Sequence, residues 1–122
     1  KDQLLAELEI KLAVLDKDDL ERRMEILHYF KQSHTLRVAA ADIARRIPLM
    51  QVSDYLSWIA EAVLQCVLQT VWNDMLERYG LPEGLDTEPD CGSDYGFGII
   101  AFGKLGGLEL GYGSDLDLVF IY

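Results

Sequence analysis

Two aspartates separated by one residue carry the clearest chemistry of this chain. Asp115 and Asp117 open the apolar run 115–122, DLDLVFIY, whose composition predicts a strand. Side chains alternate along a strand, so both carboxylates would lie on one face, and the apolar residues beyond them favour a central position in a sheet. Like charges held side by side repel, and a divalent cation relieves that repulsion. Because Mg²⁺ prefers carboxylate oxygens and substrate phosphates, this pair is a candidate catalytic and metal site.

The stretch before the aspartates is rich in glycine. Residues 97–103, FGIIAFG, predict a buried strand that ends in glycine, and further glycines follow in the connector. A bare backbone lets a phosphate come close, and amides in such a turn can cradle a triphosphate. The residues expected to bind ATP are Gly103, Lys104, Gly106, Gly107 and Ser114.

Three residues of this connector have alternative interpretations. Lys104, the one basic residue after Arg78, would either contact phosphate or be an ordinary solvated lysine. Ser114 would either bond a phosphate or cap the turn, since serine favours turns. A short helical turn is expected at 108–110, where Glu109 would either accept backbone hydrogen bonds or lie at the surface.

The elements that must position these residues are helical. Apolar residues at helical intervals predict one helix over 2–15, and a second that Asp18 caps and that ends before Pro48. A third would run from Ser53 to Gly80. The first 79 residues are therefore expected to form two long antiparallel helices preceded by a shorter one.

A change of composition divides the chain. Residues 80–96 are rich in glycine, proline and acid, which predicts a surface loop at a domain junction. We therefore expect a helical segment over 1–79, a linker over 80–96 and a strand-forming part over 97–122. This is an α+β fold, a helical bundle segment followed by two strands. Two strands make a marginal sheet, so we expect a truncated domain with further strands after residue 122.

The charge and composition of the chain limit the kinds of partner that we expect it to bind. The formal net charge is −10, and residues 80–122 carry one basic and eight acidic side chains. Nucleic-acid binding needs clustered lysine and arginine, so we expect no nucleic-acid partner. No apolar stretch is long enough to suggest a membrane span. Cys66 and Cys91 show no disulfide framework, which fits a cytoplasmic location, and His28 and His34 are expected at the surface or between helices.

The order of these features resembles the nucleotidyltransferase superfamily related to DNA polymerase β. Within that superfamily, AFGKLGGLELGYGSDLDLVFIY is similar to the signature of the glutamine synthetase adenylyltransferases, G-K-L-G-G-x-E-L followed by S-D-x-D-L. Lys104 departs from the Gly-Ser that is usual in the superfamily and points to this family. LRVAAADIA and VSDYLSWIAEAV extend the resemblance to roughly residues 30–122.

The resemblance implies an activity. It implies an enzyme that uses Mg²⁺ at Asp115 and Asp117 and transfers AMP from ATP to a tyrosine of glutamine synthetase. Bifunctional members also remove the AMP, and ELGYGSDLDL is more similar to the adenylylating half. A PII-type signal protein is an implied partner. The family also implies a third catalytic carboxylate on a later strand, so we expect residues 1–122 alone to be inactive.

The sequence is also compatible with two other classes of function. The chain could be a non-catalytic helical interaction module, in which residues 1–79 dock a partner and the strands are vestigial. It could instead belong to a small-molecule nucleotidyltransferase of the same fold. The intact D-x-D motif disfavours the first class, and the GKLGG stretch and the upstream helices disfavour the second.

Overall fold

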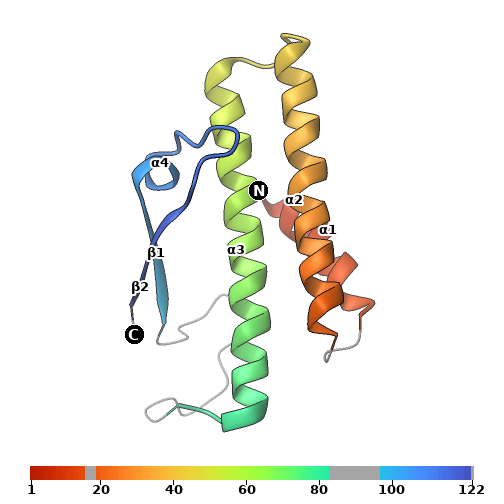
Figure 1. Cartoon of the computed structure of the whole chain (residues 1–122), viewed down its shortest axis with the longest axis vertical. Coiled ribbons are helices and arrows are strands. Elements are labelled where there is room, and N and C mark those ends of the chain that lie inside the picture. Colours follow the sequence, from red (N-terminus) through yellow and green to blue (C-terminus); the bar gives the residue numbers. More distant parts are fainter. Residues whose placement is uncertain (16–18, 83–96, 122) are drawn as a thin grey trace.

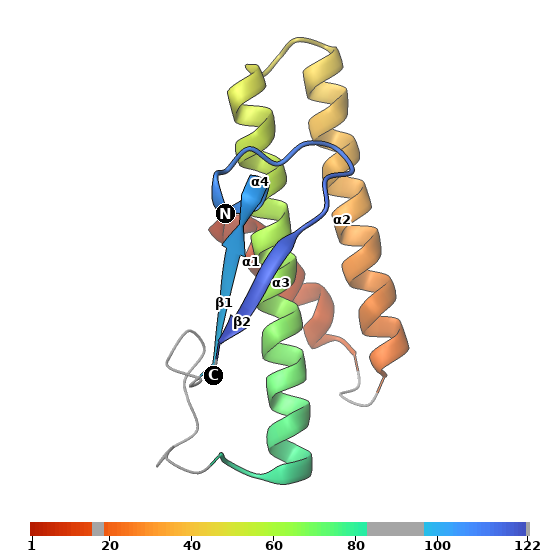
Figure 2. The same ribbon diagram turned by 60° about the vertical axis from the view of Figure 1, so that its left-hand side comes forward.

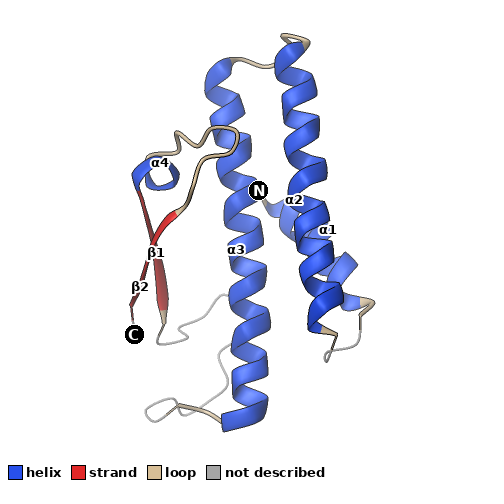
Figure 3. Cartoon of the chain, viewed as in Figure 1, coloured by secondary structure: helices blue, strands red, loops and turns tan. Residues whose placement is uncertain are grey.

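The computed structural model describes residues 1–15, 19–82 and 97–121. Most of the described residues are helical, and the rest include a small two-stranded antiparallel sheet, as Figure 3 shows. The α+β class is therefore confirmed. The elements in chain order are α1 (Asp2–Ala13), α2 (Leu20–Ile43), α3 (Leu49–Tyr79), β1 (Gly98–Phe102), α4 (Gly103–Gly106) and β2 (Asp117–Ile121).

The helices α2 and α3 lie side by side and antiparallel along the long axis of the molecule (Figure 1). Helix α1 packs against both of them. Leu8 of α1 and Phe30 of α2 are fully buried where the three helices meet, and Cys66 of α3 is buried beside them. Among the described residues, no helix combines the length and apolar character that crossing a membrane requires.

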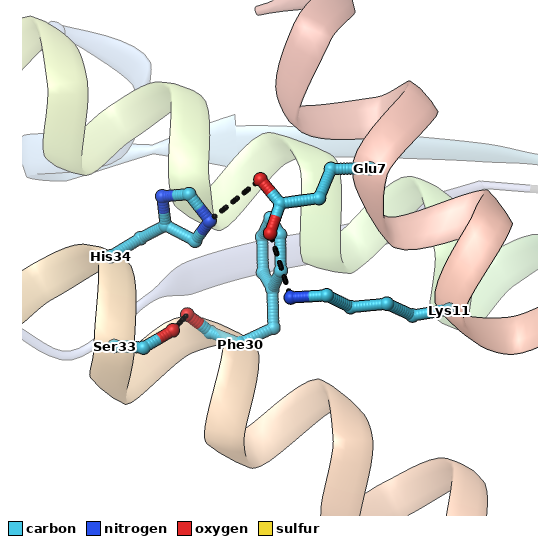
Figure 4. Close-up of polar contacts among 5 residues, drawn as sticks. All are labelled: Glu7, Lys11, Phe30, Ser33 and His34. Atoms are coloured by element: carbon cyan, nitrogen blue, oxygen red, sulfur yellow. Dashed lines mark hydrogen bonds and ion pairs between the residues drawn. The ribbon is translucent and has the colours of Figure 1, made fainter.

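A charged contact joins α1 to α2 above this core (Figure 4). The Glu7 carboxylate accepts a hydrogen bond from Lys11 Nζ at 2.7 Å, and its other oxygen lies 3.3 Å from His34 Nε2. The Lys11 ammonium stands 5.6 Å from the centre of the Phe30 ring, which in turn packs on the His34 ring. His34 is therefore an interhelical residue, one of the two positions that the sequence suggested.

The start of α2 differs from the sequence prediction by one residue. Asp19 is the N-cap, because its side chain accepts a hydrogen bond of 3.0 Å from the backbone N–H of Arg22. Asp18, the predicted cap, lies outside the described residues. The capping chemistry was predicted correctly, but its position was wrong, since either of two adjacent aspartates could supply the oxygen.

The connection between α2 and α3 lies earlier in the chain than predicted, because α2 ends at Ile43 and not just before Pro48. Helix α2 ends at Ile43 because Arg45 adopts a left-handed conformation with φ of 52°. The N–H groups of Arg45 and Arg46 then donate to carbonyls three and five residues back, the bonding pattern of a Schellman motif. Helix α3 begins at Leu49, not at Ser53, because the fixed φ of Pro48 suits a helix start.

The strands form an antiparallel pair whose register runs from Gly98↔Ile121 to Phe102↔Asp117. The second strand begins at Asp117, so the prediction that Asp115 belongs to it was wrong. Among the described residues β2 pairs only with β1 and Phe120 is 57% exposed, so its central position in a larger sheet stays a prediction. The predicted helical turn at 108–110 is instead α4, five residues earlier, because Gly103 turns the chain directly after β1.

The hairpin and α4 lie along one side of α3 (Figure 2). Leu105 and Leu110 enter the second hydrophobic cluster, which is formed mainly by α3. The buried members of this second cluster are Val38, Val52, Leu56, Ile59, Leu105 and Leu110.

The division into three parts stays a prediction, and residues 83–96 of the proposed linker lie outside the described residues.

Candidate functional site

Gly103 and Asp117 meet at the end of the hairpin where β1 gives way to α4. Phe102, the last residue of β1, pairs with Asp117, so the next backbone unit faces the Asp117 side chain. A Cβ on Gly103 would lie 2.5 Å from Asp117 Oδ2, and Gly103 has φ of 56°. Both the conformation and the close approach therefore require glycine. The structure brings these two predicted site residues together.

The turn after β1 is closed by its own backbone hydrogen bonds. The N–H of Gly107 donates to the Gly103 carbonyl at 3.0 Å, and the N–H of Glu109 donates to the Lys104 carbonyl at 2.7 Å. Gly106 lies so close to β1 that a Cβ would stand 2.5 Å from the Ala101 carbonyl oxygen. Gly106 is therefore needed for packing, and a phosphate contact to the Gly107 amide would have to replace an existing bond.

Ser114 closes the second turn of the connector. Its hydroxyl accepts a hydrogen bond of 3.1 Å from the Gly111 N–H, and its own N–H donates to the Gly111 carbonyl at 3.2 Å. This geometry matches the turn-capping alternative raised for Ser114 from the sequence. These two hydrogen bonds fix the backbone of the turn directly before Asp115.

The polar side chains of the site face solvent. Asp115 and Asp117 are exposed, and neither carboxylate takes part in an ion pair or side-chain hydrogen bond among the described residues. Lys104 and Glu109 are likewise exposed, without such a partner in the described part of the chain. Asp115, Asp117 and Lys104 are thus open to a ligand, and the structure leaves both interpretations of Lys104 standing.

Two leucines of the glycine-rich stretch anchor the site, which sequence reasoning did not foresee. Leu105 and Leu110 are buried against Val52, Leu56 and Ile59 of the helices. Burying a leucine side chain contributes roughly 1.5–3 kcal/mol, so these two contacts fix the turn on the bundle. The available signal was the presence of large apolar side chains within an otherwise small and polar connector.

A second missed contact joins the connector to α2. The Tyr112 hydroxyl donates a hydrogen bond of 3.2 Å to Asp42 Oδ2, across 70 positions of sequence. Partial burial raises the pKa of Tyr112 above its usual 10.0, and the hydrogen bond to the Asp42 carboxylate and the charge of that carboxylate raise it further. Asp42 lies in the last turn of α2, where a negative charge opposes the helix dipole.

The donors at the hairpin suit a magnesium ion shared with a substrate. No group of three or more His, Cys, Asp or Glu side chains is positioned to hold a metal within the described ranges. Mg²⁺ is usually held by one or two protein carboxylates and completes its shell with water and phosphate oxygens. The exposed carboxylates of Asp115 and Asp117, the second of which lies against the bare backbone of Gly103, fit that mode of binding.

The architecture defines an α+β chain in which a glycine-rich turn is fixed on a helical bundle and lies against the aspartate that begins β2. The whole chain, residues 1–122, matches the family described as glutamate-ammonia ligase adenylyltransferase. The chain belongs to this family, which confirms the resemblance drawn from the GKLGG and SDLDL motifs.

Curated relatives carry matching names. Bifunctional glutamine synthetase adenylyltransferase/adenylyl-removing enzymes of Pseudomonas aeruginosa and Pseudomonas putida are each 52% identical over 120 residues, which make up 98% of this chain and 12% of the relative. The enzyme of the same description from Shewanella oneidensis is 47% identical over 121 residues, 99% of this chain and 12% of its own. The chain therefore spans 12% of the length of these relatives.

Proposed function

We propose that this chain supplies the ATP-binding hairpin of an enzyme that transfers AMP from ATP to a tyrosine of glutamine synthetase. The observation that carries the proposal is the contact between the Gly103 backbone and the Asp117 carboxylate. It joins the two motifs of the family signature at one exposed corner of the hairpin. Membership of the family, and the names of the relatives, supply the reaction and the protein substrate.

In this proposal, Gly103 and Lys104 approach the triphosphate of ATP, and Asp115 and Asp117 hold the magnesium ion. The bound ion would neutralise charge on the phosphates. The tyrosine oxygen attacks the α-phosphorus and loses its proton, the bond to the bridging oxygen breaks, and pyrophosphate leaves. The contribution of the protein is positioning and charge complementarity, so the rigidity that Leu105 and Leu110 give to the turn is part of the mechanism.

We assign the chain to the adenylylating half, on the similarity of ELGYGSDLDL to that half. The protein substrate distinguishes this function from that of a small-molecule nucleotidyltransferase. The three helices favour a fixed nucleotide site over a solvated chance motif, because they hold the turn through apolar contacts. An interaction module would need the bundle alone and would not need an exposed Asp117 carboxylate against a glycine with positive φ.

The test substitutes Asp115→Asn and Asp117→Asn in a full-length enzyme that carries this segment. Transfer of labelled AMP from Mg·ATP to glutamine synthetase should fall by about a hundredfold or more for each variant, because the magnesium ion that would stabilise the transition-state charge loses a carboxylate ligand. The substitutions keep the size of each side chain, and both side chains are exposed, so the unfolding temperature should change little.

The matched control is Glu21→Gln, which removes one exposed negative charge from the start of α2. AMP transfer by this variant should stay within about threefold of the original enzyme, as expected for a surface charge. Full activity in both aspartate variants would refute the roles proposed for these carboxylates.

A further inference from the structure

The connection between α2 and α3 presents an exposed apolar surface. Ile43 is 85% exposed, Leu49 76% and Met50 79%, and all three lie at the same end of the bundle. Isolated exposed hydrophobic residues are ordinary, but several at one tip mark a contact site. We call Ile43, Arg45, Arg46, Leu49 and Met50 the α2–α3 tip.

The α2–α3 tip is also basic. Arg45 and Arg46 are exposed, and neither takes part in an ion pair within the described parts of the chain. The chain as a whole has a net charge of −10, so two adjacent cations at one end are a local departure. Arginine and methionine are enriched in protein interfaces, and an arginine fork matches a carboxylate in two hydrogen bonds.

The α2–α3 tip and the candidate site share one packing unit. Asp42, which accepts the hydrogen bond of Tyr112 from the connector, directly precedes Ile43. Ile47, inside the connection, packs against the same cluster as Leu105 and Leu110. Figure 1 shows the α2–α3 connection at the top of the molecule, with α4 and the connector below it, beside the upper half of α3. A macromolecule bound to the tip would therefore be held beside the hairpin.

We propose that the α2–α3 tip docks the protein substrate, by binding an acidic patch with neighbouring apolar side chains on glutamine synthetase. This inference rests on the proposed function, because it concerns the partner of the same site. The net charge of −10 argues against the long polyanion of a nucleic acid, against an anionic membrane and against a second copy of the chain. A protein with a local acidic patch can contact the two arginines without coming close to the negative charge on the rest of the chain.

The first test measures binding of purified glutamine synthetase to the chain by biolayer interferometry. The variant Arg45→Glu with Arg46→Glu should weaken binding about tenfold or more, because attraction becomes repulsion. The matched control is Lys31→Glu with Arg37→Glu, two exposed cations on α2 away from the tip. It makes the same change in net charge and should alter binding less than about threefold, an effect of long-range charge only.

A second variant tests the apolar half of the tip. Leu49→Ser with Met50→Ser removes two exposed side chains that support no core contact among the described residues, so circular dichroism should show unchanged helix content. Binding should again weaken about tenfold, as for truncation of interface anchors. Any of three results would overturn the proposal. Binding could weaken equally in the tip and control variants, it could stay unchanged in both tip variants, or the original chain could fail to bind glutamine synthetase at all.

The full-length enzyme separates this proposal from the one on which it rests. Tip variants should raise the KM for glutamine synthetase about tenfold while kcat and the KM for ATP stay near their original values. If Asp115→Asn abolishes AMP transfer but the tip variants leave that KM unchanged, only the docking proposal fails. Tip-dependent binding to anionic vesicles or tip-dependent dimerisation, without binding of glutamine synthetase, would also overturn it.

Discussion

Asp117 is the residue at which the geometry of the hairpin and its expected chemistry coincide. It begins β2, pairs with the last residue of β1 and turns its carboxylate onto the bare backbone of Gly103. A negative charge placed there without a bonding partner in the described part of the chain gains nothing from the fold. Under the proposed metal-binding role of Asp117, Gly103 is as important to the site as the aspartate.

We predict that Gly103→Ala is far more damaging than Gly113→Ala. Both glycines have positive φ, 56° and 69°, so each alanine should cost roughly 1–2 kcal/mol of stability from conformation alone. Only the Cβ at Gly103 would also meet Asp117, at 2.5 Å, whereas nothing lies within 4 Å of a Cβ at Gly113. Urea unfolding of both variants, and AMP transfer by the full-length enzyme, measure the difference.

The expected result is that Gly113→Ala keeps most of the activity and Gly103→Ala loses most of it. Equal stability and equal activity in the two alanine variants would contradict the idea that Gly103 exists to admit the Asp117 carboxylate.

The sequence predicts the approach of two candidate site residues, Gly103 and Asp117, better than the geometry around them. Gly103 and Asp117 do come together, because a glycine after one strand and an acid at the start of the next are local signals. Asp115 was placed on the strand face by a period-2 argument, but β2 starts two residues later. The internal bond of the Gly107 amide could not be foreseen, since it depends on where α4 begins.

At the scale of elements, the helices followed from the sequence, but several of their ends did not. Apolar spacing fixed α1, α2 and α3, because each must bury a stripe of side chains. Local chemistry then sets the ends: Asp19 caps α2, the left-handed Arg45 ends it, and Pro48 precedes the first residue of α3. The predicted stop at Gly80 was right, since glycine readily takes the φ of 77° found there.

The contact between α1 and α2 gives a prediction for these elements. The hydrogen bond from Lys11 holds the pKa of Glu7 below its usual range, and the neighbouring charges of His34 and Lys11 act in the same direction. A carboxyl whose pKa is lowered by folding stabilises the protein above its unfolded pKa, and the stabilisation is lost as pH falls through the lowered value. The Glu7 contact should therefore hold α1 in place at neutral pH.

We predict that Glu7→Gln lowers the free energy of unfolding by about 0.5 kcal/mol at pH 7, the usual size for an exposed pair. The difference from the original chain should disappear as pH falls below the ordinary range of a carboxyl. Thermal unfolding across this pH range measures it. Glu9→Gln is the control, because Glu9 lies on the same helix and forms no ion pair among the described residues. An identical pH profile for both variants would refute the assigned role.

At the scale of the whole molecule, the helical bundle and the hairpin are joined by contacts far apart in sequence. Leu105 and Leu110 enter the core of the bundle, and Tyr112 bonds to Asp42. Such contacts leave no local pattern, which is why the sequence suggested a junction at 80–96 but not how the two sides pack. The glycine-rich connector therefore serves both sides, because it shapes the site and attaches it to the helices.

The last prediction concerns the coupling between these two parts. In a double-mutant cycle, Tyr112→Phe and Asp42→Ala should each lower the free energy of unfolding, and their combined effect should be smaller than the sum by about 0.5–1.5 kcal/mol. Urea unfolding near pH 8 provides the measurement, because the raised pKa of Tyr112 keeps its hydroxyl protonated there. The coupling should fade as pH rises through that pKa, since an ionised tyrosine cannot donate to a carboxylate. Strictly additive effects, or a coupling unchanged in strong alkali, would mean that the bundle and the hairpin are joined by the leucines alone.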